Sequence, residues 1–243
     1  EVRLRYCALE ENDSDAQLFL ARMNEPDTQA AILLGIDDPH IHDLAVDVGK
    51  PCMLINCRDR HMRLPAVAPD HRAIGERAAE YLFEMGHREV MNVLCLRRYT
   101  MELRLSGIRD AWQSHNLAFN DKRDLLVVPS FSARETEQLV SDWLNQQQGK
   151  DLPTAFLVGG DFMAAGTISA LQNHGLRVPQ DMAVAGYDGI VLGRYTVPRL
   201  TTIRQNTTVL AERAADILLR CIEENAPAAH EIVPFEWVEG ESV

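Results

Sequence analysis

The chain has 243 residues, enough to bury the core of one large domain or of two small lobes. Its 24 Lys and Arg residues against 36 Asp and Glu residues give a formal net charge of −12, without a long basic stripe. This balance excludes strong binding of DNA or of an anionic membrane by this chain alone. No apolar run reaches the length of a membrane span and no signal peptide opens the chain, so we expect a cytoplasmic protein with no membrane partner.

Short apolar runs alternate with helical patterns along the chain. Strands are expected over residues 3–9, 30–36, 51–56, 90–96, 125–128, 155–158, 182–186, 201–204 and 231–238. The clearest helices are expected over residues 73–85, 102–115, 133–147, 162–174 and 209–224. This alternation predicts an α/β fold built on doubly wound, mostly parallel sheets with right-handed crossovers.

The segment 153–189 is the most complete strand, helix, strand unit, and its polar residues lie only at the strand ends. Asp161 follows the first strand and is placed to cap the helix, which Gly175 ends. Tyr187 and Asp188 follow the second strand. Because ligands bind at the carboxyl ends of parallel strands, the unit predicts a ligand site.

Motifs for catalysis and for cofactors are missing from the sequence. It contains no Gly-x-Ser-x-Gly elbow, no phosphate-binding glycine loop and no Gly-x-Gly-x-x-Gly. His40-x-His42 has metal-like spacing, but further ligands at binding spacing are missing, and we interpret it as a surface loop. The five cysteines are an odd number and are expected to be reduced and packed. We therefore expect no enzyme activity, no cofactor and no metal.

Several short motifs occur in order from residue 70 to residue 205. They are Asp70 with Gly75 and Ala78; Tyr81-Leu82; Met85-Gly86-His87-Arg88; Arg104-x-x-Gly107; Pro153-Thr154-Ala155; Gly160-Asp161-x-Met163-Ala164-x-Gly166; Val178-Pro179-x-Asp181; Gly186-Tyr187-Asp188; and Pro198-x-Leu200-Thr201-Thr202-Ile203-x-Gln205. Each motif is weak alone, but the ordered set resembles the effector-binding domain of the LacI/GalR family of bacterial transcriptional regulators. The resemblance covers nearly the whole chain and implies a two-lobed, periplasmic-binding-protein-like fold.

The resemblance also implies how the chain divides between the lobes. An N-terminal lobe would comprise residues 1–86 and 205–233, and a C-terminal lobe residues 87–204 and 234–243. The first strand and helix of the first lobe would be missing, which would leave an unpaired, apolar sheet edge and a less stable lobe. The family's DNA-binding headpiece, a helix-turn-helix, would precede this chain and is absent from it.

The ligand pocket of the family lies between the lobes, and the resemblance assigns two charged residues to it. Arg104 lies in the first turn of the helix expected after the strand 90–96, where its guanidinium could hold ligand oxygens in pairs. Asp188 would accept hydrogen bonds from hydroxyl or ring N–H groups of the ligand. The alternatives are a solvent-facing helix arginine and a turn aspartate before Gly189.

Three further residues resemble the pattern of the purine-responsive members of the family. Phe131 matches a position that packs an aromatic face on the ligand ring, which suits a sugar and a purine alike, although it could also be a buried core residue. Arg98 and Thr100 lie upstream of Arg104, and Arg98 could equally be solvated.

Two carboxylates assigned to the site could have a purely structural role instead. Two other positions depart from the family pattern. Asp161 and Asp70 each match a family position near the ligand, yet each could instead cap the helix that follows it. Gly160 stands where many sugar-responsive members carry Asn, and Ser132 stands where the purine-responsive pattern has an acidic residue. The effector class therefore stays open between a sugar, placed first, and a purine or nucleoside.

These assignments imply the effector-sensing and dimerisation domain of a LacI-type repressor. Its partners would be a small-molecule effector, a second copy of the chain in a homodimer, and operator DNA reached through the headpiece. The alternative is a periplasmic solute-binding protein of a sugar transporter, which shares the fold, and a third possibility is a sugar- or nucleoside-processing enzyme. The odd cysteine count favours the repressor.

Overall fold

The computed structural model describes residues 3–8, 15–147, 151–224 and 226–243. Contacts divide the chain into two compact units. Unit 1 comprises Glu1–Ala68 and Thr208–Glu231, and unit 2 comprises Pro69–Thr207 and Ile232–Val243. Among the described residues, no helix has both the length and the apolar character needed to cross a bilayer.

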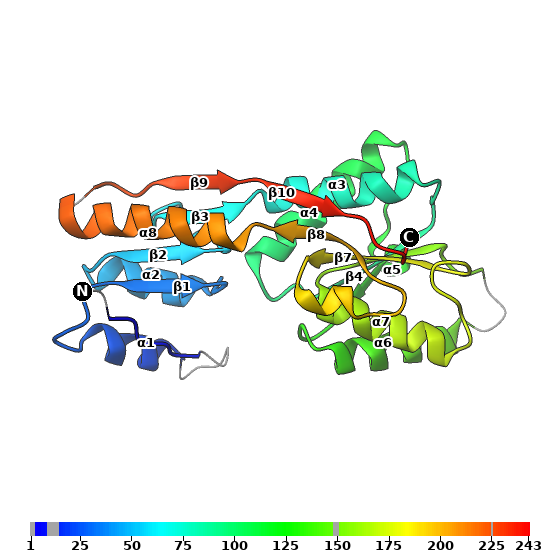
Figure 1. Cartoon of the computed structure of the whole chain (residues 1–243), viewed down its shortest axis with the longest axis horizontal. Coiled ribbons are helices and arrows are strands. Elements are labelled where there is room, and N and C mark those ends of the chain that lie inside the picture. Colours follow the sequence, from blue (N-terminus) through cyan, green and yellow to red (C-terminus); the bar gives the residue numbers. More distant parts are fainter. Residues whose placement is uncertain (1–2, 9–14, 148–150, 225) are drawn as a thin grey trace. The chain divides into compact units, whose positions relative to one another are not determined.

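Unit 1 is a small α/β layer structure around one sheet (Figure 1). Its elements are α1 (Asp15–Met23), β1 (Ala31–Leu34), α2 (Pro39–Asp47), β2 (Cys52–Ile55), β3 (Ala66–Pro69), α8 (Thr207–Glu224) and β9 (His230–Val233). The strands follow the order β1-β2-β3-β9, and the pairs β1–β2 and β2–β3 are parallel. Phe19, Leu33, Ile41 and Leu54 belong to its apolar core, which joins α1 and α2 to the sheet.

Unit 2 is larger and contains a six-stranded sheet. Its elements are α3 (His71–Glu84), β4 (Val90–Leu94), α4 (Tyr99–Ser114), α5 (Asp121–Asp124), β5 (Leu125–Val127), α6 (Ala133–Gln146), β6 (Ala155–Val158), α7 (Asp161–Asn173), β7 (Ala183–Asp188), the 3-10 helix η1 (Val191–Arg194), β8 (Thr201–Gln205) and β10 (Phe235–Val238). The strand order is β10-β8-β7-β6-β4-β5, and only β10 runs antiparallel to its neighbour.

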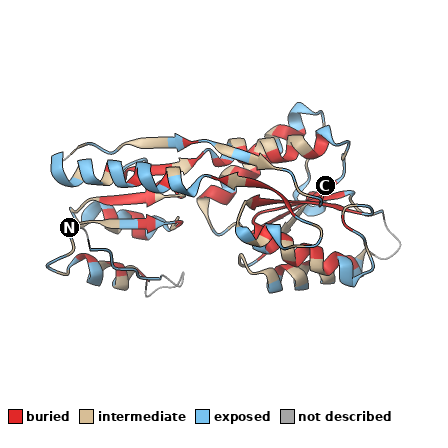
Figure 2. Cartoon of the chain, in the orientation of Figure 1, coloured by how far each residue is buried: buried red, intermediate tan, exposed pale blue. Residues whose placement is uncertain are grey.

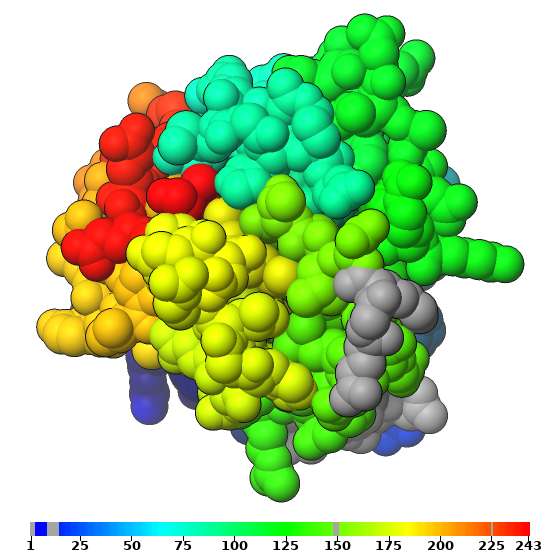
Figure 3. Space-filling model, turned by 90° about the vertical axis from the view of Figure 1, so that its right-hand side faces the viewer, coloured from blue at the N-terminus to red at the C-terminus, as the bar shows by residue number. Residues whose placement is uncertain are grey.

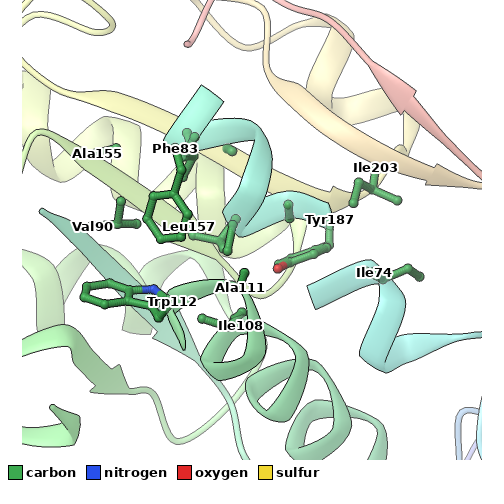
Figure 4. Close-up of a cluster of buried hydrophobic side chains, with 14 of the residues drawn as sticks. Ile74, Phe83, Val90, Ile108, Ala111, Trp112, Ala155, Leu157, Tyr187 and Ile203 are labelled. Carbon is green, nitrogen blue, oxygen red and sulfur yellow. The ribbon is translucent and has the colours of Figure 1, made fainter. Parts of the chain in front are cut away.

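Two apolar clusters cover the two faces of the unit 2 sheet. Alternate residues of β4 divide between them: Val90 and Leu94 pack with α3 and α4, whereas Met91 and Val93 pack with α6 and α7. Figure 4 shows the first cluster, with Trp112 of α4 and Phe83 of α3 beside strand residues such as Leu157. The four inner strands β8, β7, β6 and β4 are correspondingly buried (Figure 2). The three layers confirm the predicted doubly wound α/β fold.

The carboxyl terminus of the chain is fastened to unit 2. The hydroxyl of Ser242 donates to the carbonyl of Val184 and accepts from the backbone N–H of Thr201. Figure 3 shows the end of the chain, in red, against a yellow segment of unit 2. Both segments therefore belong to one folded unit although they lie far apart in the sequence.

Three predicted elements differ in the structure. Residues 3–8 form no strand. The expected strand 231–238 is two strands, because Pro234 has no N–H to continue the ladder, and β9 and β10 pair in different sheets. The prediction of a surface loop around His40-x-His42 is wrong, since both residues lie in α2. Asp38 caps this helix by accepting from the backbone N–H groups of His40 and Ile41.

Strand β3 and helix α2 had no counterpart among the predicted elements. Helix α3 belongs to unit 2, because Ile74, Ala78 and Leu82 pack in the first unit 2 cluster. The chain passes between the units after Ala68, after Thr207 and after Glu231.

Candidate functional site

The predicted site residues of unit 2 gather at the carboxyl edge of its sheet. In the sheet, β5 and β6 lie on opposite sides of β4, and the chain runs from β4 to β5 before it crosses to β6. The loops after β4 and β6 therefore diverge, which makes this edge the topological switch point where α/β folds bind ligands. The edge carries Arg98 and α4 after β4, Phe131 after β5, Gly159-Gly160-Asp161 after β6, Asp188 at the end of β7 and Gln205 at the end of β8.

Arg104 is the centre of this edge. Its side chain is only 2% exposed. Its Nη1 donates to the carbonyl of Gly159 at 3.0 Å, and its Nε donates to Nδ1 of His71 at 3.3 Å. The guanidinium carbon lies 4.8 Å from the ring centroid of Tyr187, and Nη2 lies 3.8 Å from Oδ1 of Asp188. The solvent-facing alternative for Arg104 is therefore wrong.

Arg104 lies one turn further along its helix, α4, than expected. The helix begins at Tyr99, so Arg104 lies in its second turn rather than its first. Glycines let α3 and α4 approach closely at this level: a Cβ on Gly75 would lie 2.1 Å from the carbonyl oxygen of Arg104, and one on Gly107 would lie 1.9 Å from that of Arg72. This contact between backbones brings the start of α3 beside the guanidinium.

His71 lies against Arg104 at this edge and was not among the residues that the sequence analysis selected. It is the first residue of α3, buried at 4% exposure, and it faces Arg104 through Nδ1. Burial, with a second contribution from the charge of Arg104, holds the pKa of His71 well below its usual range, so the ring is neutral. Asp70 caps α3 and thereby fixes the next residue at the helix start, which is the signal that could have found it.

Asp188 presents a carboxylate beside Arg104 from a strained backbone. Its φ of 102° lies in the left-handed region that residues other than glycine rarely adopt, and such strain is concentrated at functional sites. Its Oδ1 accepts from Nε2 of Gln205 at 3.3 Å, and its side chain remains 37% exposed. A Cβ on Gly160 would lie 3.1 Å from Oδ2 of Asp188, so an Asn at this position would crowd the carboxylate.

Asp161 does not cap α7, contrary to the prediction. The N-cap position is Gly160, and the carboxylate of Asp161 instead accepts from the hydroxyl of Thr202 at 2.7 Å and from the backbone N–H of Ile190 at 2.8 Å. The residue is fully buried, and this burial, together with the nearby charge of Asp188, raises the pKa of Asp161 to about 7. Asp161 therefore ties the ends of β6, β7 and β8 together.

The remaining predicted residues lie at different distances from this centre. The guanidinium of Arg98 stacks 4.7 Å above the ring of Phe131, which is partly buried against the second apolar cluster. Thr100 is buried in the first turn of α4. Asp70 is exposed, and its carboxylate accepts from the backbone N–H of Arg72 and Ala73 at 3.0 Å, as expected for a helix cap.

The arrangement can recognise a small polar molecule. Arg104 offers N–H donors, Asp188 offers acceptor oxygens, and the stacked pair of Arg98 and Phe131 lies on neighbouring loops. In the part of the chain that the structure describes, no group of three His, Cys, Asp or Glu residues is placed to hold a metal ion.

Comparison with known proteins identifies relatives for most of the chain. A family model described as a periplasmic binding protein-like domain matches residues 79–243. The HTH-type transcriptional repressor PurR of Histophilus somni (strain 129Pt) is 35% identical over 157 residues, which cover 64% of this chain and 45% of that protein. The chain thus spans about half the length of this relative.

Solved structures share the fold at lower identity. The putative transcriptional regulator LacI of Bacillus cereus subsp. cytotoxis NVH 391-98 superposes with a TM-score of 0.85 at 23% identity, covering 98% of this chain and 84% of that one. A sugar-binding transcriptional regulator of the LacI family from Escherichia coli, complexed with phosphate, gives a TM-score of 0.77 at 23% identity, covering 95% and 81%.

Proposed function

Because the chain belongs to the periplasmic-binding-protein-like domain family, in the form carried by LacI/GalR transcriptional regulators, we propose that it is the effector-binding domain of a repressor. The observation that carries the proposal is the buried guanidinium of Arg104. It is held by Gly159 and His71 so that Nη2 faces the partly exposed carboxylate of Asp188. A structural arginine would not need an exposed, strained carboxylate as its neighbour.

The proposed effector is a small polar molecule, with a sugar as first candidate and a purine or nucleoside as second. Arg104 and Asp188 together present donors and acceptors, which match the hydroxyl groups of a sugar and the ring edge of a purine. Phe131, Arg98 and Thr100 would complete the site on one side. Asp161 and Asp70 would act indirectly, the first by fixing the strand ends and the second by capping α3.

The proposed mechanism is a shift between two arrangements of the units. An effector that binds one arrangement more tightly than the other raises its population, and a DNA-binding headpiece attached to each copy of a homodimer would respond. A tenfold change in operator affinity requires only about 1.4 kcal/mol of coupling. Such a protein would work in the cytoplasm, where the operator lies.

A periplasmic solute-binding protein remains the alternative function, since it uses the same fold. The names of the relatives support the regulator, because they are transcriptional repressors and regulators. The same names support a ligand-binding protein rather than an enzyme.

The first test is a thermal-shift screen of the chain with glucose, cellobiose, adenosine and hypoxanthine. A ligand at a hundred times its Kd stabilises a folded protein by about 2.7 kcal/mol. We expect one probe to raise the Tm of the wild type, and Arg104→Ala and Asp188→Asn each to abolish that shift. Arg109→Ala is the matched control, because Arg109 lies on the same helix but forms an exposed ion pair with Asp121.

Two outcomes would count against the proposal. A shift that persists in both site variants would place the ligand elsewhere. A probe that is converted to a product during the assay would support an enzyme instead.

A further inference from the structure

The imidazole of His71 contains a buried nitrogen with no hydrogen-bond partner among the described residues. Nδ1 faces Nε of Arg104 at 3.3 Å, whereas Nε2 has less than 1 Å² of exposed surface and no partner. Leaving a buried polar group unpaired destabilises a protein by about 1–3 kcal/mol. Such a group at the edge of a candidate site needs an explanation.

The hydrogen bond with Arg104 determines which nitrogen of His71 carries the proton. A guanidinium only donates, so Nδ1 must accept and cannot be protonated. The single proton of the neutral ring is therefore on Nε2. His71 thus presents a buried N–H donor whose acceptor is missing from the described part of the chain.

We propose that the Nε2–H of His71 donates a hydrogen bond to an acceptor atom of the effector bound at Arg104 and Asp188. This assignment rests on the proposed function and adds a specificity-determining residue to it. His71 comes from α3, whereas Arg104 comes from α4 and Asp188 from β7, so a ligand held by all three contacts three elements of unit 2.

The assignment restricts the chemistry of the effector. The molecule must carry a lone pair for His71, such as a carbonyl, hydroxyl or ether oxygen or an unprotonated ring nitrogen. It must also offer a donor to the carboxylate of Asp188. A cationic group is excluded at the His71 position, because the N–H donor and the adjacent guanidinium of Arg104 would both repel it.

Two amide substitutions separate ligand binding from the positioning of Arg104. The amide of Asn overlaps Nδ1 of a histidine, so His71→Asn retains an acceptor for Arg104 and loses the Nε2 donor. The longer amide of Gln reaches the Nε2 position, so His71→Gln retains the donor and loses the acceptor. If His71 binds the effector, His71→Asn weakens binding of the responding probe about tenfold, and His71→Gln stays near the wild type.

The opposite ranking would overturn the assignment. If His71 only positions Arg104, His71→Asn binds the probe as the wild type does and His71→Gln loses affinity. Equal affinity of both variants and the wild type would also overturn it, while loss of binding in Arg104→Ala would leave the proposed function standing. If none of the four probes binds the wild type, the proposed function fails for these ligands and the assignment to His71 fails with it.

A second measurement needs neither ligand nor variant. The ¹⁵N chemical shifts of the histidine ring distinguish the two neutral tautomers and the charged form. We expect His71 of the ligand-free chain to be neutral with its proton on Nε2, and the Nε2 signal to shift when the responding probe binds. A ring protonated on Nδ1, or on both nitrogens, would overturn the assignment even if the two amide variants fail to fold.

Discussion

At the scale of single residues, the buried carboxyl of Asp161 links the stability of the chain to pH. Its pKa of about 7 in the folded chain lies well above the ordinary value of 3.8, mainly because of burial. Between these two values, the folded chain retains a proton that the unfolded chain has released. The contribution of Asp161 to the free energy of unfolding is therefore fully present below 3.8 and is lost as the pH rises through 7.

Asp161→Asn should remove this contribution to the pH dependence. An amide can accept from the backbone N–H of Ile190 while donating to the hydroxyl of Thr202, which can rotate to accept. Denaturant unfolding between pH 5 and pH 8 measures the effect, and the wild type should lose stability relative to the variant by at most about 1.4 kcal/mol per pH unit as the pH rises.

Comparing the wild type with Asp161→Asn also controls for His71, the other group of the site whose pKa is shifted. His71 has a lowered pKa, so its own contribution has the opposite sign: it is present above the ordinary histidine range and is lost as the pH falls. Both proteins carry His71, and the difference between them cancels its effect. Parallel pH profiles of the wild type and Asp161→Asn would show that Asp161 is already ionised at pH 5.

The residues of the site differ in how far sequence could predict them. Asp188 was accessible because it ends a strand, which is a local pattern, and Arg104 was accessible through the ordered motifs that resemble the LacI/GalR family. The role of Asp161 and the presence of His71 were not, because their partners Thr202 and Arg104 lie 41 and 33 residues away in the sequence. Whether a carboxylate caps its own helix or bonds to a distant strand is decided by packing alone.

At the scale of elements, the pair α3 and α4 positions the site. Arg104 lies on α4 and His71 on α3, and the two helices are in backbone contact at Gly75 and Gly107. A side chain at either glycine would separate the helices, because the nearest atoms are carbonyl groups that cannot rotate away. The distance between Arg104 and His71 therefore depends on two residues that touch no ligand.

Gly75→Ala should destabilise the chain and impair the site together. The added Cβ would lie 2.1 Å from the carbonyl oxygen of Arg104, and forcing such an overlap in a packed contact typically destabilises by about 1–3 kcal/mol. Thermal unfolding measures the loss. Ala78→Gly is the control, since it weakens the same helix by about 1 kcal/mol in helix propensity and removes one buried methyl group, without adding an atom.

The two variants should differ in the ligand assay more than in stability. Gly75→Ala moves Arg104 relative to His71, so it should lower the affinity for the responding probe, whereas Ala78→Gly should leave that affinity unchanged at a temperature where both are folded. Equal affinities would mean that the contact between the helices does not set the geometry of the site.

Element boundaries were predicted where the signal is local. Gly86 has a φ of 97° directly after α3, and Gly175 has a φ of 79° after α7, as expected for glycines that end helices. The sheet that α3 covers is not a local property, because an amphipathic helix does not reveal which sheet it packs on. Its apolar face packs with α4 and the unit 2 sheet, and no residue within the helix encodes that choice.

At the scale of the whole molecule, the units differ in how completely their sheets are protected. The unit 2 sheet is covered on both faces by apolar clusters. In unit 1, β1 is an edge strand, and its side chains Ile32 and Leu34 are 44% and 64% exposed. An exposed apolar edge strand can pair with a strand of another molecule, so we expect aggregation to begin at β1.

Leu34→Lys should therefore slow aggregation, because a lysine on an edge strand opposes pairing with a second copy. Light scattering on mild heating measures the effect. Leu219→Lys is the matched control: Leu219 is 43% exposed on α8, so the substitution adds the same charge to the same unit away from any sheet edge. Both lysines reduce the net charge of −12 by one, so charge alone would favour aggregation in both variants. Slower aggregation of Leu34→Lys alone would identify β1 as the point of association, whereas equal rates in the two variants would contradict it.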